Sequence, residues 1–349
     1  MTRADPTRIR ALVEFLCSEP CAGRAPGTPE GRAARDRVQR ELAAAGALPA
    51  GPGGEWLQPV PGCGGDNVLG RLPGARERSI VVGAHYDHLG RTGNDAYWGA
   101  DDNAAAVAIL VEVAHLLRGV ELGREVLLCA FDAEEPPHFH DESMGSIHYV
   151  KHPPVPLERV DAMVCMDLVG HALGPAGLTP ELRDSLFVLG AGRGVGLGAV
   201  VDATPRPAGV IPRRVSCEVI PALSDYFAFD RARIPFLFLT CGRWEHYHEV
   251  TDTPEKLAYE KIAATAEWLA ALVVNLAAHE GPFPYVPGGS DDLATVASLR
   301  AVGEALGTFD PRALALRAAL ATFPSKEPFT PGQRQRLSAL VGMIESALG

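Results

Sequence analysis

Three short apolar runs end in acidic or histidine residues, and this pattern limits the fold more than any other feature of the chain. Residues 80–84 lead into His85, residues 125–133 lead into Glu134, and residues 160–166 lead into Asp167. Continuous apolar runs of this kind are typical of central strands that are covered on both faces. Because the carboxyl ends of strands in an open α/β sheet border one crevice, the polar residues that follow them are expected to converge there.

Helical patterns alternate with these strands. An amphipathic helix is predicted from about residue 29 to residue 45, and a second helix over residues 103–117. Thr253-Pro254 is typical of a helix start and is expected to open a long helix that runs to about Ala278. Alternating strands and helices predict an α/β protein whose sheet lies between two layers of helices.

The chain changes character after about residue 280. A linker-like stretch, GPFPYVPGGSDD, is followed by three predicted helices whose starts are marked by Ser290-Asp291, Asp310-Pro311 and Thr330-Pro331. We therefore predict a catalytic domain over residues 1–284 and a helical C-terminal extension over residues 285–349. The extension carries no residues with evident chemistry, so we expect it to act as a helical cap or as a contact in a homo-oligomer.

Charge and cysteine content narrow the class of protein. The net charge is −11 and no basic tract offsets it, which argues against a nucleic-acid partner. The seven cysteines are scattered, without a CxxC pair, which favours a reduced compartment over a disulfide framework. No apolar stretch approaches the ~20 residues that a bilayer requires, and the N-terminus does not read as a signal peptide. We expect a cytoplasmic protein without a membrane partner.

The candidate site residues combine imidazole and carboxylate groups without a thiolate. This ligand set favours zinc in a catalytic role over a structural zinc site. Asp101 and Asp102 precede the predicted helix at 103–117, and either one can bridge two cations or simply cap the helix. Adjacent side chains point in different directions, so the pair Glu134-Glu135 can divide into a metal ligand and a general base.

Six motifs in a fixed order resemble one family. They are HYD, GADDNAAAVAILVEVAHLL, AEE…MGS, MDLVG, SDYFAF…IPFLFLT and YHEVTDTPEKL. Together they resemble the zinc aminopeptidases of metallopeptidase family 28, which also includes glutaminyl cyclases and glutamate carboxypeptidases. The resemblance covers roughly residues 15–280 and leaves out the helical extension. It implies a zinc exopeptidase fold with a central mixed, mostly parallel sheet.

The resemblance also implies a set of metal ligands for two zinc ions per chain. His85 and Asp167 would hold one ion, Glu135 and His248 would hold the other, and Asp101 would bridge them. His246 competes with His248, but the spacing of His248 to Asp252 fits the family.

The family match implies further roles around the metals. Glu134 would be the general base that activates a metal-bridging water, and Asp87 would orient the ring of His85. Tyr247 would donate a hydrogen bond to the developing oxyanion. A cis peptide bond is expected between Asp101 and Asp102.

Two departures from the family pattern concern the substrate. The stretch PPHFHDES at residues 136–143 intervenes after Glu135 and is expected to lie near the metals, and Tyr226 stands where a histidine is common. His138 and His140 lie in this inserted loop, which is more typical of a solvated loop than of another metal site.

These observations predict an aminopeptidase that hydrolyses N-terminal residues from peptides or other aminoacyl amides. Two alternatives remain: a glutaminyl-peptide cyclotransferase that uses a single zinc ion, and a non-catalytic interaction protein of the same fold.

Overall fold

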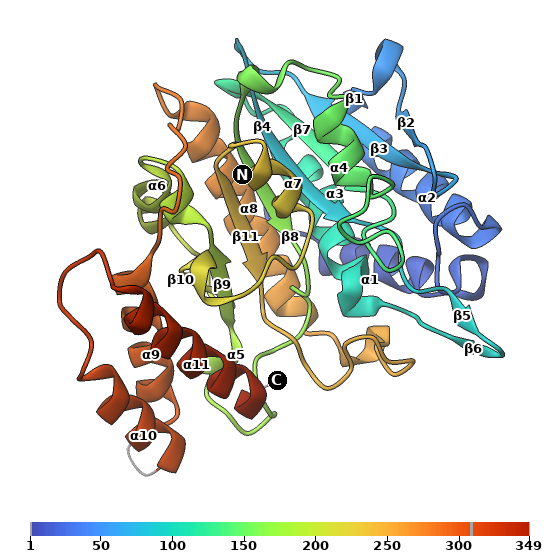
Figure 1. The fold of residues 1–349 in the computed structure, drawn as a ribbon. Helices are drawn as coiled ribbons and strands as arrows, with labels where there is room; N and C mark the ends of the chain where they lie inside the picture. The colour runs from blue at the N-terminus through green and yellow to red at the C-terminus, as the bar shows by residue number, and fades with distance from the viewer. Residues whose placement is uncertain (1, 308–309, 349) are drawn as a thin grey trace.

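The computed structural model describes residues 2–307 and 310–348 and shows a mixed sheet between two helical layers (Figure 1). The strands are β1 Leu48–Pro49, β2 Leu57–Val60, β3 Gly65–Leu72, β4 Arg76–His85, β5 Arg91–Thr92, β6 Asp95–Ala96, β7 Arg124–Phe131, β8 Val160–Met166, β9 Ser185–Leu189, β10 Ile211–Val215 and β11 Phe236–Thr240. The predicted α/β sandwich is confirmed.

Helices cover both faces of the sheet. They are α1 Pro6–Leu16, α2 Pro29–Ala44, α3 Ala105–Leu117, α4 Gly145–Lys151, α5 Pro180–Arg183, α6 Leu197–Ala203, α7 Tyr226–Arg231, α8 Tyr259–Ala278, α9 Asp292–Ala305, α10 Pro311–Leu320 and α11 Pro331–Leu348. Helices α1, α2, α3, α6 and α8 pack on one face, whereas α4, α5, α7 and the three C-terminal helices pack on the other.

The main sheet has the order β1-β3-β7-β4-β8-β11-β9-β10, with β2 also paired to β3. Its centre is parallel: β4 lies between β7 and β8, and β11 pairs with β8 in the same direction. Antiparallel pairs flank this centre at β3 with β7 and at β9 with β11. The carboxyl ends of β7, β4 and β8 therefore meet at one edge, as predicted from the apolar runs.

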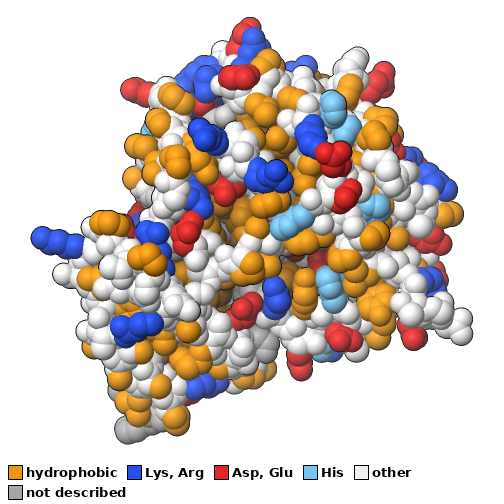
Figure 2. Space-filling view, viewed as in Figure 1, with side chains coloured by type: hydrophobic (Ala, Val, Ile, Leu, Met, Phe, Trp, Pro, Cys, Tyr) orange, Lys and Arg blue, Asp and Glu red, His pale blue; other side chains and the backbone are white. Residues whose placement is uncertain are grey.

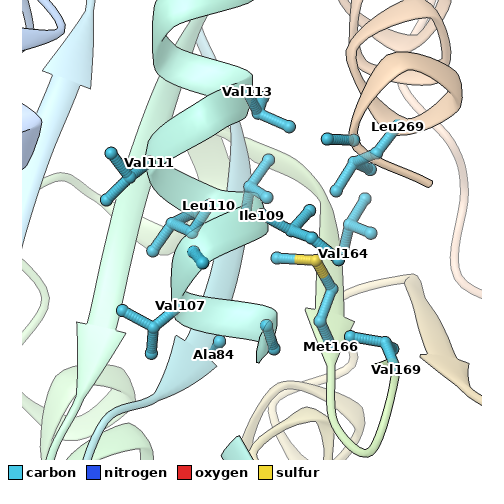
Figure 3. Close-up of a cluster of buried hydrophobic side chains, with 14 of the residues drawn as sticks. Ala84, Val107, Ile109, Leu110, Val111, Val113, Val164, Met166, Val169 and Leu269 are labelled. Atoms are coloured by element: carbon cyan, nitrogen blue, oxygen red, sulfur yellow. The ribbon is translucent and has the colours of Figure 1, made fainter. Parts of the chain in front are cut away.

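Side chains along the central strands alternate between the two faces of the sheet, so each strand contributes to the hydrophobic core on both faces. In β4, Ile80, Val82 and Ala84 face the core that contains α3 and α8, whereas Val81 faces the opposite core. The close-up in Figure 3 shows Val164 and Met166 of β8 among side chains of α3, with Leu269 of α8 beside them. A strand that is buried on both faces needs apolar residues at every position, which explains the continuous runs.

The long helix α8 begins five residues later than predicted. Thr253-Pro254 opens only the short 3₁₀ turn Pro254–Lys256, because Leu257 is extended (φ −79°, ψ 148°) and separates this turn from α8 at Tyr259. Contrary to the prediction that no apolar stretch has the length that a bilayer requires, α8 is long and apolar enough to cross a membrane, but 72% of its most apolar window is buried in the core.

The C-terminal helices begin where the sequence places them. Asp310 caps α10 by accepting from the backbone N–H of Arg312, and Thr330 and Gln333 form a reciprocal cap at the start of α11. These helices form the red lobe beside β9 and β10 in Figure 1. Leu299, Leu316 and Leu337 of the lobe share a core with side chains of the sheet, so the extension is packed onto the sheet.

Candidate metal centre

The strand ends bring four of the predicted site residues together. His85 is the last residue of β4, Glu134 and Glu135 follow β7, and Asp167 follows β8 directly. Because β4 lies between β7 and β8, these side chains share one edge of the sheet. His85 Nε2 lies 3.6 Å from Asp167 Oδ1 and 3.8 Å from Glu134 Oε2.

His248 reaches the same cluster from the loop before α8. Its Nε2 lies 3.1 Å from Glu135 Oε2 and 3.3 Å from Asp102 Oδ2. The other oxygen of Asp102, Oδ1, lies 3.3 Å from His85 Nε2. One carboxylate therefore spans the two histidines, and each histidine has a further acidic neighbour.

The bridging position belongs to Asp102, so the prediction that Asp101 bridges is wrong by one residue. Asp101 turns away from the cluster: its Oδ1 accepts from the backbone N–H of Gly170 at 2.5 Å, and its Oδ2 lies 2.6 Å from His171 Nδ1. The cis peptide bond is displaced in the same direction, because it joins Asp102 and Asn103.

Backbone contacts decide which aspartate faces the cluster. The N–H groups of Asp101 and Asp102 both donate to the buried carboxylate of Asp252, which fixes this turn from outside the cluster. The turn then departs from helical geometry at Asp102 (φ −110°, ψ 83°) before α3 begins. This side chain therefore does not follow the helical register that the sequence pattern suggests.

A buried arginine supports the same turn. The guanidinium of Arg24 donates to the carbonyl oxygens of Tyr86 at 2.7 Å, Trp98 and Gly99 at 2.6 Å, and Asp102 at 3.1 Å. These bonds join the segment after β4 to the turn that carries Asp102. Through Arg24, the N-terminal segment GRAPGTPEG at residues 23–31 supports the turn that carries Asp102.

The cluster suits a divalent cation. His85 Nε2, Asp102 Oδ2 and Asp167 Oδ1 are buried and have no hydrogen-bond partner. The side chains of His85, Asp102 and Asp167 each present a ligand atom within 4.8 Å of the others, as do those of His85, Glu134 and Glu135. Buried polar atoms normally find partners, and imidazole and carboxylate groups that converge without partners fit a zinc ion.

The electrostatics of the cluster agree with this interpretation. Burial lowers the pKa of His248, but the nearby carboxylates of Asp102 and Glu135 outweigh burial and raise it to about 10. Burial raises the pKa of Glu134 well above its usual value, and the nearby carboxylates of Asp167 and Glu135 add to this although His85 opposes it. The surroundings thus favour positive charge and penalise a further negative charge.

Asp87 supports both sides of the cluster. Its Oδ1 accepts from the N–H of Glu134 and its Oδ2 from the N–H of Glu135, both at 3.1 Å. The same Oδ1 lies 3.5 Å from His85 Nδ1, the ring nitrogen that faces away from the cluster. Asp87 therefore lies where it can fix the ring of His85 and the backbone of the glutamate pair.

The structure places Tyr247 at the edge of the cluster and His246 outside it. The ring of Tyr247 stacks on His248 with centroids 3.9 Å apart. His246 Nδ1 instead lies 2.9 Å from Thr251 Oγ1, on an exposed part of the loop. The oxyanion role of Tyr247 stays a prediction.

The loop at residues 136–143 is exposed beside Glu135. His138 Nδ1 lies 2.7 Å from Ser143 Oγ, and the ring of His140 stacks between Phe139 and Phe227 with centroids 4.0 Å from each. Among the described residues these histidines join no group able to hold a metal. The loop is thus held by its own side chains and by Phe227 of α7.

Sequence reasoning missed several residues around the cluster. His88 Nδ1 lies 2.8 Å from Glu135 Oε1, and His88 forms a potential metal-holding group with Asp102 and Glu135. Asp225 is buried with neither carboxylate oxygen hydrogen-bonded, and burial raises its pKa to about 7. Asp225 lies in the motif SDYFAF and His88 directly follows the motif HYD, so their places in or beside these motifs were the available signal.

Comparisons with known proteins find similar sequences and similar folds. The uncharacterised protein YfbL of Escherichia coli K12 is 30% identical over an alignment of 244 residues, and the match covers 62% of this chain and 74% of YfbL. The LapA aminopeptidase of Legionella pneumophila has a similar structure, with a TM-score of 0.64 and 17% identity over 80% of this chain and 73% of LapA. Glutaminyl cyclase of Bacteroides thetaiotaomicron, solved with N-acetylhistamine, has a TM-score of 0.59 and 18% sequence identity over 78% of this chain and 99% of the cyclase.

The model of peptidase family M28 matches residues 67–273, more than half of the chain. This range contains every residue of the metal cluster, from His85 to His248, and ends before the helical extension. The chain therefore belongs to peptidase family M28.

Proposed function

We propose that this protein is an aminopeptidase that holds two zinc ions. One observation carries the proposal: the carboxylate of Asp102 spans His85 and His248, and each histidine has its own acidic neighbour. A carboxylate with both oxygens available between two such groups is the arrangement that a two-metal hydrolase requires. The expectation of a peptide or aminoacyl amide substrate follows from this site and from the family.

The proposed ligands divide into two sets around Asp102. His85 and Asp167 would hold one ion, Glu135 and His248 would hold the other, and Asp102 would bind both. When bound, the ions would lower the pKa of the attacking water and polarise the scissile carbonyl. His88 contacts Glu135 through Nδ1 and would hold that carboxylate in place.

Glu134 would carry the proton. Its backbone is fixed by Asp87, and its carboxylate lies at the edge of the cluster, 3.8 Å from His85 Nε2. The carboxylate takes a proton from the attacking water as the water oxygen bonds to the scissile carbon. The protonated Glu134 then gives that proton to the amine nitrogen as the C–N bond breaks.

The free amine of the substrate is the feature that the acidic cluster would recognise. Glu134, Glu135 and Asp167 lie close together in a site that favours positive charge. An ammonium group bound there places the first peptide bond, rather than an internal bond, at Glu134. Recognition of the free amine therefore favours an exopeptidase over an endopeptidase.

A substrate panel tests the proposed function. The zinc-loaded full-length chain is expected to release the N-terminal residue from dipeptides and aminoacyl p-nitroanilides and to leave the N-acetylated forms intact. Mass spectrometry of the products distinguishes removal of one residue from internal cleavage. No hydrolysis across the panel would overturn the proposal.

The structural similarity to a glutaminyl cyclase supports a second candidate function, that of a glutaminyl cyclase. A cyclase would convert peptides with N-terminal glutamine to pyroglutamyl peptides and release ammonia, a reaction that the same mass spectra detect. Zinc content measured on the purified chain adds a further test, since we expect about two ions per chain for the peptidase and one for the cyclase.

Removal of the metal should destabilise the fold. Chelation leaves Asp102, Glu134, Glu135 and Asp167 buried together without the cations that compensate them. Zinc present at a hundred times its dissociation constant would contribute about 2.7 kcal/mol to the free energy of unfolding. Differential scanning calorimetry with and without a chelator should show a lower melting temperature for the stripped chain, and zinc should restore it. An unchanged melting temperature would contradict a resident metal.

A further inference from the structure

An apolar cavity begins beside the metal cluster and ends at the C-terminal helices. It has a volume of about 100 Å³. Asp167 and Tyr247 lie at its wall on the side of the cluster, so the cavity adjoins the candidate active site. Its remaining surface is mostly apolar, with Leu189 and Phe238 supplied by β9 and β11.

The helical extension supplies one wall of this cavity. Leu299 and Val302 of α9 line it, together with Val341 and Ile344 of α11. In Figure 2 the extension forms the lobe at the lower left of the molecule, and a hollow separates this lobe from the face on which histidine side chains reach the surface. The family model ends at residue 273, so this wall is an addition that the family match does not cover.

Hydrogen bonds hold the extension firmly against the site. Glu345 Oε1 of α11 accepts from the N–H of Arg243 at 3.1 Å, in the loop that carries Tyr247 and His248. Ser298 Oγ of α9 donates to the carbonyl oxygen of Arg214 in β10 at 2.7 Å. The wall is thus fixed relative to the metal cluster.

We propose that the extension is a specificity element: α9 and α11 form the wall of a pocket that takes a large apolar side chain of the substrate's N-terminal residue. This inference rests on the proposed aminopeptidase function. With the amine and the scissile carbonyl at the acidic cluster, the neighbouring apolar cavity is where the side chain would be buried.

Size and polarity of the side chain should therefore govern the rate. Burial of a leucyl or phenylalanyl side chain gains the transfer free energy of its apolar surface, whereas an alanyl side chain leaves most of the cavity unfilled. A charged side chain would lose its hydration among Leu299, Val302 and Ile344. We expect kcat/KM for leucyl and phenylalanyl p-nitroanilides to exceed the values for alanyl and glutamyl substrates about tenfold or more.

Val341→Trp tests the wall directly. Val341 is partly buried on the cavity side of α11, so the larger ring should occupy the space that a leucyl side chain needs. We expect kcat/KM for the leucyl and phenylalanyl substrates to fall about tenfold or more, with less than about a threefold change for the alanyl substrate. Met343→Trp is the matched control, because Met343 is exposed on the same helix and the substitution places a tryptophan outside the cavity.

A second measurement separates the pocket from the reaction. L-Leucinol and L-alaninol carry the free amine and the side chain but no scissile bond, so their affinities can be compared by calorimetry on the zinc-loaded chain. Leucinol should bind about tenfold more tightly than alaninol to the wild type, and Val341→Trp should remove this difference. Ile344→Ala, which enlarges the cavity, should shift preference toward phenylalanyl substrates and serves if Val341→Trp does not fold.

The outcomes distinguish the two proposals. A wild type that hydrolyses no substrate but prefers leucinol, with the preference lost in Val341→Trp, would overturn the aminopeptidase function and keep the pocket. A wild type that hydrolyses the panel but whose side-chain preference is the same in Val341→Trp would overturn the role of the extension alone. Equal effects of Met343→Trp and Val341→Trp would also overturn it.

Discussion

Replacing Glu134 by glutamine is expected to lower kcat/KM by a factor of about 10² to 10⁴ while leaving the bound zinc in place. The amide keeps the size of the side chain but cannot take a proton from water. The backbone of Glu134 is held by Asp87 rather than by its own side chain, so the substitution should leave the turn intact. Substrate kinetics and zinc analysis on the same preparation provide the measurement.

Glu135→Gln is the matched control, because it changes the adjacent residue in the same way. Glu135 Oε2 lies 3.1 Å from His248 Nε2, and its Oε1 lies 2.8 Å from His88 Nδ1, so this carboxylate lies between two imidazoles. We expect Glu135→Gln to lose zinc together with activity. If Glu134→Gln also loses zinc, Glu134 is a ligand and the proposed division of the pair is wrong.

Full activity of Glu134→Gln toward the whole panel would contradict the mechanism itself. Inactivity of the wild type, with any cellular effect of the protein unchanged in Glu134→Gln, would instead favour a non-catalytic interaction protein. The variant therefore separates the enzyme from that alternative as well.

The central part of the fold was predictable from the sequence because burial on both faces demands uninterrupted apolar residues. The run from Ile80 to Ala84 and the run over residues 160–166 became the adjacent strands β4 and β8, and the residues that follow them meet at one edge. The strand β10, Ile211–Val215, had no such signal, since Arg213 and Arg214 interrupt its apolar pattern. In the structure Arg213 donates to Ser185 Oγ and Arg214 donates to Asp291 Oδ1. Tertiary contacts, rather than local pattern, make it a strand.

The start of α8 shows the limit of a local signal. Thr253-Pro254 favours the beginning of a helix, and the chain does make one turn there. Leu257 then becomes buried in an extended conformation, which delays α8 to Tyr259. Propensity identified the turn correctly, but packing decided its length.

The candidate site was predictable to within one residue at its centre. Strand ends place His85, Glu134, Glu135 and Asp167 together, and the family register adds His248. The choice between Asp101 and Asp102 depends instead on contacts made by residues distant in sequence. Asp252 lies 150 residues further along the chain from Asp102, and no spacing rule contains the hydrogen bonds that its carboxylate accepts from this turn.

Asp102→Asn and Asp101→Asn are expected to have contrasting effects on zinc binding. Asp102 spans His85 and His248, so the amide should weaken zinc binding at least about a hundredfold, since loss of an outer partner alone costs 10- to 100-fold. Activity should fall with the metal. Asp101 contacts Gly170 and His171 instead, so Asp101→Asn should retain zinc and most of the activity.

Asp101→Asn should be detected in stability rather than in metal content. Its carboxylate is buried and accepts from the N–H of Gly170 beside the ring of His171, and loss of its charge weakens both contacts. We expect a loss of about 1–3 kcal/mol in the free energy of unfolding, measured by denaturant titration of the zinc-loaded chains. If Asp101→Asn loses zinc and Asp102→Asn keeps it, the bridging position lies at Asp101 after all. In that case the backbone turn that Asp252 fixes must rearrange around the metal, because Asp101 and Asp102 cannot both leave their present neighbours while the turn keeps its conformation.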